Sequence, residues 1–285
     1  MPELPEVETI RRQLAPKLEG CTLESLEILD PRWCSPLSTS ETANAVIGRR
    51  ITTLSRRGKY FIVELSDEIF LIVHLRMTGT LLYDPVLPVP HSRVRFTLDD
   101  GNVLLFVDPR RFGTGQLVFG LRSLEDFFKR RLGVEPFDRG FTQEHLRAIT
   151  NTSRSPIKPF LLDQHRIAGI GNIYADEALF RARIHPLRPA NRLTFSQVRV
   201  LHQAVIDSLQ AGIDANGATI DDFRGIDGAR GSFQNEFLIH RREGQPCLAC
   251  GTAVIKMTVG GRGTYVCESC QTRPRAKRLS PQAAR

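Results

Sequence analysis

Apolar residues near the start of the chain recur at helical spacing. Val7, Ile10, Leu14 and Leu18 are three or four positions apart, and Gly20 follows them. Residues at this spacing lie on one face of a helix, and a glycine commonly follows the last turn. The pattern therefore predicts an amphipathic helix that ends near Gly20.

The period then shortens to that of β-strands. Between about residues 22 and 119, short apolar or alternating runs are bounded by turn residues, and Asp100-Gly101 separates two of them as a hairpin turn would. The clearest runs are Tyr60 to Leu65, Ile69 to Leu75, Val94 to Leu98 and Val103 to Val107. Several antiparallel strands over a hundred residues predict a β-sandwich with the first helix packed against it.

Helical periodicity returns at Leu124 to Leu132. The following stretch from Gly133 to Gly140 carries Pro136 and is interpreted as an interdomain linker. In the second domain, Thr194 and Gln197 match a capping box at the start of a helix. The predicted buried stripe of this helix consists of Val198, Leu201, Val205 and Leu209. Residues 213–235 have the composition of a mobile, glycine-rich loop.

Composition and charge narrow the function classes. The chain has 285 residues, is 41% hydrophobic and 25% charged, and carries 39 Lys plus Arg against 31 Asp plus Glu, a net charge of +8. This balance fits a folded protein with a polyanionic partner, although charge alone does not select one. The apolar run from Ile69 to Val73 is far too short for a membrane helix, and the acidic start differs from a signal peptide. We expect a cytoplasmic protein.

Four of the six cysteines predict a metal site. Cys247 and Cys250 form one C-x2-C pair, Cys267 and Cys270 form another, and sixteen residues separate the pairs. This spacing is typical of a four-cysteine zinc ribbon, and four thiolates leave no open position for a catalytic water. The sequence predicts one structural Zn2+, with Arg262 at the tip of a β-hairpin between the pairs. Cys21 and Cys34 are expected to be small buried hydrophobic residues.

The N-terminus offers a candidate nucleophile. Removal of Met1 would make the secondary amine of Pro2 the chain terminus, with Glu3 and Glu6 close by. A terminal amine with a pKa of about 7.8 is partly neutral at pH 7, whereas a lysine with a pKa of about 10.4 is almost wholly charged. A secondary amine also forms an iminium without an N–H to lose, which suits elimination on a ring-opened sugar. Proline in a first helical turn is, however, also common for structural reasons.

The residues from Met1 to Thr9 resemble the start of the bacterial formamidopyrimidine-DNA glycosylase family, and further motifs match in the family's order. These motifs are Arg57 to Tyr60, His74 to Gly79, Asp108 to Gly113, Ile157 to Pro159, Gly169 to Ala175 and the four cysteines. The resemblance implies an enzyme that removes oxidised bases from double-stranded DNA and nicks the abasic site. It also implies an α+β fold: a helix plus antiparallel β-sandwich, then a helix-two-turns-helix domain and a zinc finger.

The resemblance also implies roles for individual residues. Pro2 would attack the anomeric carbon, Glu3 would act as acid and base on the sugar, Glu6 would position the terminus, and Lys59 would lie near the lesion and its phosphate. The side chains that would contact DNA are His74, Met77, Arg110, Phe112, Lys158, Asn172 and Arg262. Of these, Met77, Arg110 and Phe112 would enter the duplex as the base leaves. Each of these roles has a simpler alternative. Met77 and Phe112 could be core residues, and His74 could have a purely structural role. Lys59 and Arg262 could be solvated surface residues.

Departures from the family pattern concern the choice of base. Ala229, Ser232 and His240 stand where the family often has side chains that can bond to a base or pack on it, and Arg76 stands where it has glycine. Excision of oxidised purines, 8-oxoguanine and formamidopyrimidines, is the leading hypothesis. An endonuclease VIII-like preference for oxidised pyrimidines and a non-catalytic damaged-DNA-binding protein are the alternatives. A zinc-ribbon transcription factor would explain the cysteines but not the N-terminus.

The predicted organisation follows the order of these motifs. We expect a monomer with five segments: a catalytic helix and β-sandwich domain at 1–132, a linker at 133–140, a helix-two-turns-helix domain at 141–235 with a lesion-recognition loop at 216–235, a zinc finger at 236–273 and a basic tail at 274–285. The tail would add affinity for phosphate.

Overall fold

The computed structural model describes residues 1–220 and 223–274, so the predicted basic tail lies outside the described residues from residue 275 onward. The chain forms two compact units that each collect segments far apart in sequence. The first unit comprises Met1–Phe141, Leu162–Gly171 and Ile206–Phe237, and the second comprises Thr142–Leu161, Asn172–Val205 and Leu238–Arg285. The domain boundaries expected along the chain stay predictions.

The first unit begins with the predicted helix, α1, which spans Leu4–Leu18. The apolar stripe is buried as expected, with Val7, Ile10 and Leu14 fully inaccessible to solvent. The first turn is buried as well, including the carboxylates of Glu3 and Glu6. Burial of two acidic side chains at a helix start is not explained by packing of an amphipathic stripe, and their partners are described below.

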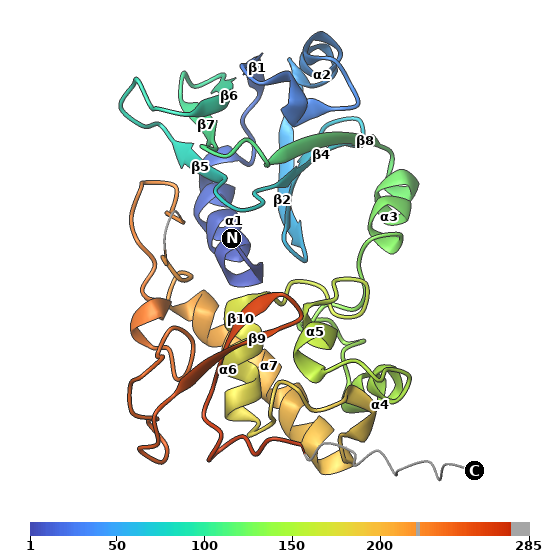
Figure 1. Ribbon diagram of the computed structural model, residues 1–285. Helices are drawn as coiled ribbons and strands as arrows, with labels where there is room; N and C mark the ends of the chain where they lie inside the picture. Colours follow the sequence, from blue (N-terminus) through green and yellow to red (C-terminus); the bar gives the residue numbers. More distant parts are fainter. Residues whose placement is uncertain (221–222, 275–285) are drawn as a thin grey trace, which may run out of the picture. The chain divides into compact units, whose positions relative to one another are not determined.

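Two antiparallel four-stranded sheets form the predicted sandwich (Figure 1). One sheet has the order β1 (Leu23–Ile28), β6 (Ser92–Leu98), β7 (Val103–Val107) and β5 (Thr80–Tyr83). The other has the order β2 (Ile51–Arg57), β3 (Tyr60–Leu65), β4 (Ile69–His74) and β8 (Thr114–Phe119). The turn η1 (Pro31–Cys34) and helix α2 (Thr39–Val46) lie between β1 and β2 in sequence. The expected hairpin at Asp100-Gly101 joins β6 and β7, and Gly101 has a φ of 83°.

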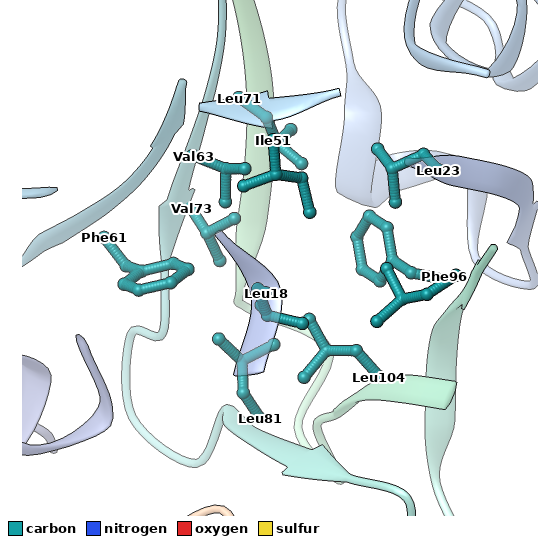
Figure 2. A pocket seen from close by; sticks show the side chains of 11 residues that line it. Leu18, Leu23, Ile51, Phe61, Val63, Leu71, Val73, Leu81, Phe96 and Leu104 are labelled. Atoms are coloured by element: carbon teal, nitrogen blue, oxygen red, sulfur yellow. The ribbon is translucent and has the colours of Figure 1, made fainter. Parts of the chain in front are cut away.

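The core of the first unit lies between the two sheets and includes α1. A cavity of about 20 Å³ in this core is lined entirely by apolar side chains (Figure 2). The lining includes Leu18 of α1, Phe61 and Leu71 of one sheet, and Phe96 and Leu104 of the other. A dry space of this size holds at most about one water molecule, so it is a packing gap and not a ligand pocket.

The opposite face of the β3–β4 pair is also covered. Helix α3 (Leu121–Lys129) places Phe127 and Phe128 in a cluster with Ile62, Phe70 and Ile72. All six residues of β4 are buried, which explains why its sequence is a continuous apolar run and not an alternating one.

Among the described residues, the second part of the chain contains four α-helices, and the last of them is the helix predicted to start at Thr194. They are α4 (Gln143–Asn151), α5 (Ile157–Leu162), α6 (Asn172–Arg181) and α7 (Phe195–Asp214), with short turns at η2 (Ala190–Arg192) and η3 (Phe233–Asn235). The capping box before α7 is confirmed, because the N–H of Thr194 donates to Oε1 of Gln197 at 3.0 Å and the N–H of Gln197 donates to Oγ1 of Thr194 at 3.2 Å.

Two local expectations are corrected by the structure. Strands β9 (Ile255–Val259) and β10 (Arg262–Val266) form the expected hairpin, but its tip is Gly260-Gly261, and Arg262 is the first residue of the returning strand. The glycines occupy the tip because both have positive φ, 57° and 72°. Cys34 is buried as expected, whereas Cys21 is partly exposed.

Among the described residues, no helix is long and apolar enough to cross a membrane.

Candidate functional site

The start of α1 is held in place by backbone and side-chain contacts within the first unit. The N–H of Leu4 donates to the carbonyl oxygen of Gly169 at 3.1 Å, and the N–H of Glu3 donates to Oε2 of Glu6 at 2.8 Å. Pro2 is buried, and the carboxylates of Glu3 and Glu6 are 2% and 1% exposed. Three residues predicted to be catalytic are therefore next to one another in a region largely closed to solvent.

The Gly169-x-Gly171 pair lies directly against this region. A Cβ atom at Gly171 would lie 2.1 Å from the carboxyl carbon of Glu3, and one at Gly169 would lie 2.5 Å from a methyl group of Leu4. Gly169 also has a φ of 91°, which only glycine adopts readily. The glycines allow close approach to the start of α1, which is a packing requirement that the motif match by itself did not indicate.

Glu6 also binds the glycine-rich loop. Its Oε1 atom accepts the N–H of Ala218 at 2.8 Å, while Oε2 accepts the N–H of Glu3. The loop is anchored to α1 at a second point, because the N–H of Ile226 donates to Oε1 of Gln13 at 3.2 Å. The described part of this loop is thus bound to the helix that carries the predicted catalytic residues.

Lys59 lies in the turn directly before β3 and is 5% exposed. This turn is held by the predicted linker: the carboxylate of Glu135 accepts the N–H of Gly58 and two hydrogen bonds from Arg56, at 2.8 and 2.9 Å. Arg57 donates to Asp138 of the same segment at 2.7 Å. This segment, expected to be an interdomain linker, therefore holds the backbone next to Lys59.

His74 ends β4 and is almost fully buried. Burial, together with the positive charges of Arg76 and Lys59, lowers the pKa of His74 to about 3. Its Nδ1 accepts the N–H of Arg76 at 3.0 Å, so the neutral ring carries its hydrogen on Nε2. Arg76 has a φ of 55°, which explains why glycine suits this position in the family motif. The imidazole of His74 is thus neutral and not a cation.

The predicted duplex-entering side chains lie on two loops of the first unit. Met77 follows β4 and is partly exposed, while Arg110 and Phe112 lie between β7 and β8 and are both exposed. The guanidinium of Arg110 lies 4.9 Å from the centre of the Phe112 ring. A core position for Phe112 is ruled out, since 52% of it is accessible, and Met77 is only partly buried.

In the second unit, two predicted DNA-binding residues converge on the zinc-finger hairpin. Nζ of Lys158 donates to the carbonyl oxygen of Gly263 at 3.0 Å, and so does Nδ2 of Asn172, also at 3.0 Å. Lys158 is 0% exposed and forms an ion pair with Asp176, with 2.6 Å between Nζ and Oδ1. The sequence suggested an available phosphate-binding cation, but the ammonium group is enclosed. Arg262, adjacent to Gly263, is exposed.

His240, which departs from the family pattern, takes part in the same network. Its Nδ1 lies 2.8 Å from Oδ2 of Asp176, and its ring packs edge to face against Tyr265. Asp176 thus bridges Lys158 and His240. The neighbouring carboxylate of Glu177 accepts backbone N–H groups of residues 238 to 240, and its burial raises its pKa. His240 is therefore a buried residue and not an exposed one on a binding face.

The four predicted metal ligands are brought together. The sulfur atoms of Cys247, Cys250, Cys267 and Cys270 all lie within 4.8 Å of one another. The Sγ atoms of Cys250 and Cys267 are 3.5 Å apart, and those of Cys247 and Cys270 are 3.9 Å apart. Tetrahedral ligands at a Zn–S distance of about 2.3 Å would be separated by about 3.8 Å. The donor set therefore fits one tetrahedral metal ion.

Four functional carboxylates or amides were not found from the sequence. Asp108, Glu135, Asp176 and Gln13 each bind a residue that is at least 18 positions away in the chain. Asp108 is within one of the motifs quoted above and Asp176 directly follows another, which is the one signal that could have drawn attention to them. Their partners could not have been identified from local pattern, because the contacts span tens of residues.

Comparisons with known proteins agree over most of the chain. Residues 1–115 match the formamidopyrimidine-DNA glycosylase N-terminal domain, residues 132–224 the formamidopyrimidine-DNA glycosylase H2TH domain, and residues 244–273 a zinc finger found in FPG and IleRS. The formamidopyrimidine-DNA glycosylase of Pelotomaculum thermopropionicum is 44% identical over 95% of this chain and 99% of its own length. That of Bacillus licheniformis is 39% identical over 95% and 99%.

Solved structures give the same result. The Lactococcus lactis Fpg in complex with DNA containing an abasic site is 36% identical, covers 95% of this chain and 100% of its own, and superimposes with a TM-score of 0.89. The same Lactococcus lactis protein has been solved with Fapy-dG-containing DNA and with DNA containing an oxidised pyrimidine.

Proposed function

Since the chain belongs to the formamidopyrimidine-DNA glycosylase family and is a DNA glycosylase that acts on damaged DNA, we propose that it excises oxidised purines and then nicks the abasic strand. The observation that carries the proposal is the buried start of α1, where Glu6 accepts the N–H of Glu3 beside a buried Pro2. The Pro2 amine, held at this position, would be oriented toward one reacting carbon. Such orientation of a nucleophile contributes much of the rate enhancement in covalent catalysis.

The proposed reaction begins once Met1 has been removed. The nitrogen of Pro2 forms a bond to C1′ of the damaged nucleotide, the glycosidic bond breaks, and the base leaves with a proton. Glu3 transfers protons at the sugar as the ring opens to a Pro2 iminium. The iminium acts as an electron sink, so that loss of a C2′ proton expels the 3′ phosphate and a second elimination expels the 5′ phosphate. Glu6 holds the terminus in place.

The DNA partner would be bound by residues of both units, each through its own contacts. In the first unit, Met77, Arg110 and Phe112 would occupy the space left by the extruded base, with Lys59 and His74 toward the phosphate backbone. In the second unit, Arg262 and Asn172 would contact phosphate. For Lys158, we infer that the enclosed ammonium holds the hairpin through Gly263, and the direct phosphate contact belongs to its exposed neighbour Arg262.

We infer that the four-cysteine cluster holds one structural Zn2+. Two C-x2-C pairs, sulfur separations near those of a tetrahedral thiolate site and the zinc-finger match over residues 244–273 support this choice. The metal would cross-link the two C-x2-C pairs. The protein would act as a monomer on bacterial chromosomal DNA, in the cytoplasm.

Borohydride trapping tests the proposal. Correctly processed protein should become covalently attached to abasic-site DNA when borohydride is present, because a Pro2 iminium is reduced to a stable amine. Pro2→Gly should weaken trapping, and protein that retains Met1 should give none, since its amine lies one residue away. Binding without trapping by processed protein would favour a damage-binding protein without catalysis.

Defined lesions decide the substrate. We expect excision of formamidopyrimidine and 8-oxoguanine from duplexes with cytosine opposite. Faster excision of oxidised pyrimidines than of either purine lesion would replace the purine assignment with the endonuclease VIII-like alternative.

A further inference from the structure

The carboxylate of Asp108 is fully buried and accepts four hydrogen bonds. Oδ2 accepts the N–H of Phe112 at 2.8 Å and the N–H of Gly113 at 2.7 Å. Oδ1 accepts the N–H of Arg110 at 3.2 Å and the hydroxyl hydrogen of Thr78. One side chain, 0% exposed, thus binds three backbone groups of its own loop and one side chain from another loop.

The two loops that meet at Asp108 carry the predicted duplex-entering side chains. Thr78 directly follows Met77 between β4 and β5, whereas Arg110 and Phe112 lie between β7 and β8. The N–H of Arg110 also lies 3.4 Å from Oγ1 of Thr78. The hydroxyl of Thr78 therefore connects the backbone beside Met77 to the carboxylate that organises the Arg110–Gly113 loop.

A second contact fixes the same two loops. A Cβ atom at Gly113 would lie 2.3 Å from the ring of Phe106, and one at Gly79 would lie 3.0 Å from it. Both loops therefore pack closely on one buried ring, on glycines that cannot be enlarged without displacing it. The side chains of Arg110 and Phe112 are nevertheless exposed, so the loop backbone is held in place while these side chains face solvent.

Hydrogen bonds to a buried carboxylate are among the stronger ones in proteins, and a buried carboxylate without donors is costly. The arrangement at Asp108 therefore resists separation of the two loops. A wedge that fills the gap left by an extruded base works best when its members are held at a fixed spacing before DNA arrives, because little further ordering is then required.

We propose that Asp108 is a positioning residue that, through Thr78, joins the two loops into one preorganised wedge and so sets the rate at which a damaged base leaves the stack. This inference rests on the proposed function. It assigns Asp108 and Thr78 to base extrusion and not to the covalent chemistry, which takes place at Pro2. Loss of the hydrogen bond between Thr78 and Asp108 should slow the reaction only on substrates whose damaged base must be extruded.

Thr78→Val tests this with little change of shape, since it removes the hydroxyl and leaves Asp108 its three backbone donors. Thr42→Val is the matched control, because Thr42 is also buried in the first unit and donates its hydroxyl hydrogen to a carbonyl, that of Ser38 at 2.9 Å. Two duplexes are compared in single-turnover experiments: one with formamidopyrimidine opposite cytosine and one with a preformed abasic site.

We expect Thr78→Val to slow excision of formamidopyrimidine by about tenfold, the equivalent of one hydrogen bond to a charged group, and strand nicking at the abasic site by less than about twofold. Mismatched pairs flanking the lesion make extrusion easier and should restore most of the lost rate. Asp108→Asn keeps only one acceptor oxygen. It should also slow excision more than nicking at the abasic site, and it should slow excision more than Thr78→Val does. Thr42→Val should leave both rates near those of the wild type.

Equal slowing on both duplexes, or no slowing of excision in either variant, would overturn the proposal. Urea unfolding of each variant shows whether the first unit is folded, and the ratio of the two rates is unaffected by a loss of active protein. Failure of the proposed function itself would look different, because the wild type would then excise no formamidopyrimidine at all.

Discussion

The carboxylate of Glu6 accepts the N–H of Ala218 at 2.8 Å, across 212 residues of sequence. The other oxygen of the same carboxylate accepts the N–H of Glu3, one residue after the predicted nucleophile. Gly217 precedes Ala218 with a φ of 79°, and a Cβ atom there would lie 3.0 Å from Cγ of Glu6. The start of α1 and the glycine-rich loop thus share one buried acceptor.

Glu6→Gln should affect both stability and catalysis. Glutamine offers one acceptor oxygen and an NH2 group, so one of the two N–H groups, of Glu3 or Ala218, would face a donor. We expect the free energy of unfolding in urea to fall by about 1–3 kcal/mol and covalent trapping to slow. Glu27→Gln, at an exposed position, is the control. Unchanged stability and trapping in Glu6→Gln would show that the shared acceptor is dispensable.

The low pKa of His74 predicts a pH dependence of stability. The folded protein keeps the ring neutral down to about pH 3, whereas the unfolded chain takes up a proton near pH 6.5, so stability is lost as the pH falls from about 6.5 toward 3. Between pH 7 and pH 5 this loss amounts to about 2 kcal/mol.

His74→Asn should remove that part of the pH dependence while keeping an acceptor for the N–H of Arg76. The measurement is the free energy of urea unfolding at pH 7 and pH 5 for both proteins. Burial would raise the pKa of Glu8, but hydrogen bonds and charge interactions with arginines outweigh it and lower this pKa to about 2. Glu8 therefore titrates below pH 5 in both the folded and the unfolded protein, outside the range from pH 7 to pH 5. An identical slope in wild type and variant would contradict the assignment to His74.

Cys250→Ala should open the metal site without unfolding the first unit, because the four sulfur ligands all lie in the second. We expect the metal content, measured by mass spectrometry, to fall to near zero and the affinity for duplex DNA to drop. Cys21→Ala is the control, since Cys21 is outside the cluster. Full affinity in metal-free Cys250→Ala would mean that the finger does not contribute to binding.

Arg262→Ala should be milder than loss of the metal. If its exposed guanidinium contacts a phosphate, the slope of log affinity against log salt should decrease by about one, with lesion preference unchanged. Fluorescence anisotropy at several salt concentrations measures the slope. A slope equal to that of the wild type would leave Arg262 as a solvated residue at the start of β10.

We expect the residues at positions 229 and 232 of the glycine-rich loop to weaken this protein's preference for 8-oxoguanine relative to formamidopyrimidine and abasic sites. Ala229 and Ser232 are exposed and lack the long side chains that could hold an extruded purine. Ala229→Lys with Ser232→Tyr should raise the single-turnover rate on 8-oxoguanine and leave the abasic-site rate near its starting value. Equal wild-type rates on 8-oxoguanine and formamidopyrimidine, with no gain from the double substitution, would show that the loop backbone suffices.

Local pattern was sufficient for the first helix, for several strands of the sandwich, for the start of α7 and for the metal ligands. The buried stripe of α1, the hairpin at Asp100-Gly101 and the capping box at Thr194 all depend on residues within a few positions of one another. The cysteine pairs are likewise defined by short spacings. Such features are encoded in backbone geometry and side-chain periodicity, which a sequence displays directly.

The tertiary structure decided what the side chains of the motifs do. Lys158 is a cation in the sequence, but the fold encloses it against Asp176. Asp108 is only the first residue of a matching motif in the sequence, but in the fold it joins two loops through Thr78. Glu6 became a shared acceptor only because folding brought Ala218 beside it. A buried polar group must find a partner wherever the fold supplies one, and a partner tens or hundreds of residues away leaves no trace in local periodicity.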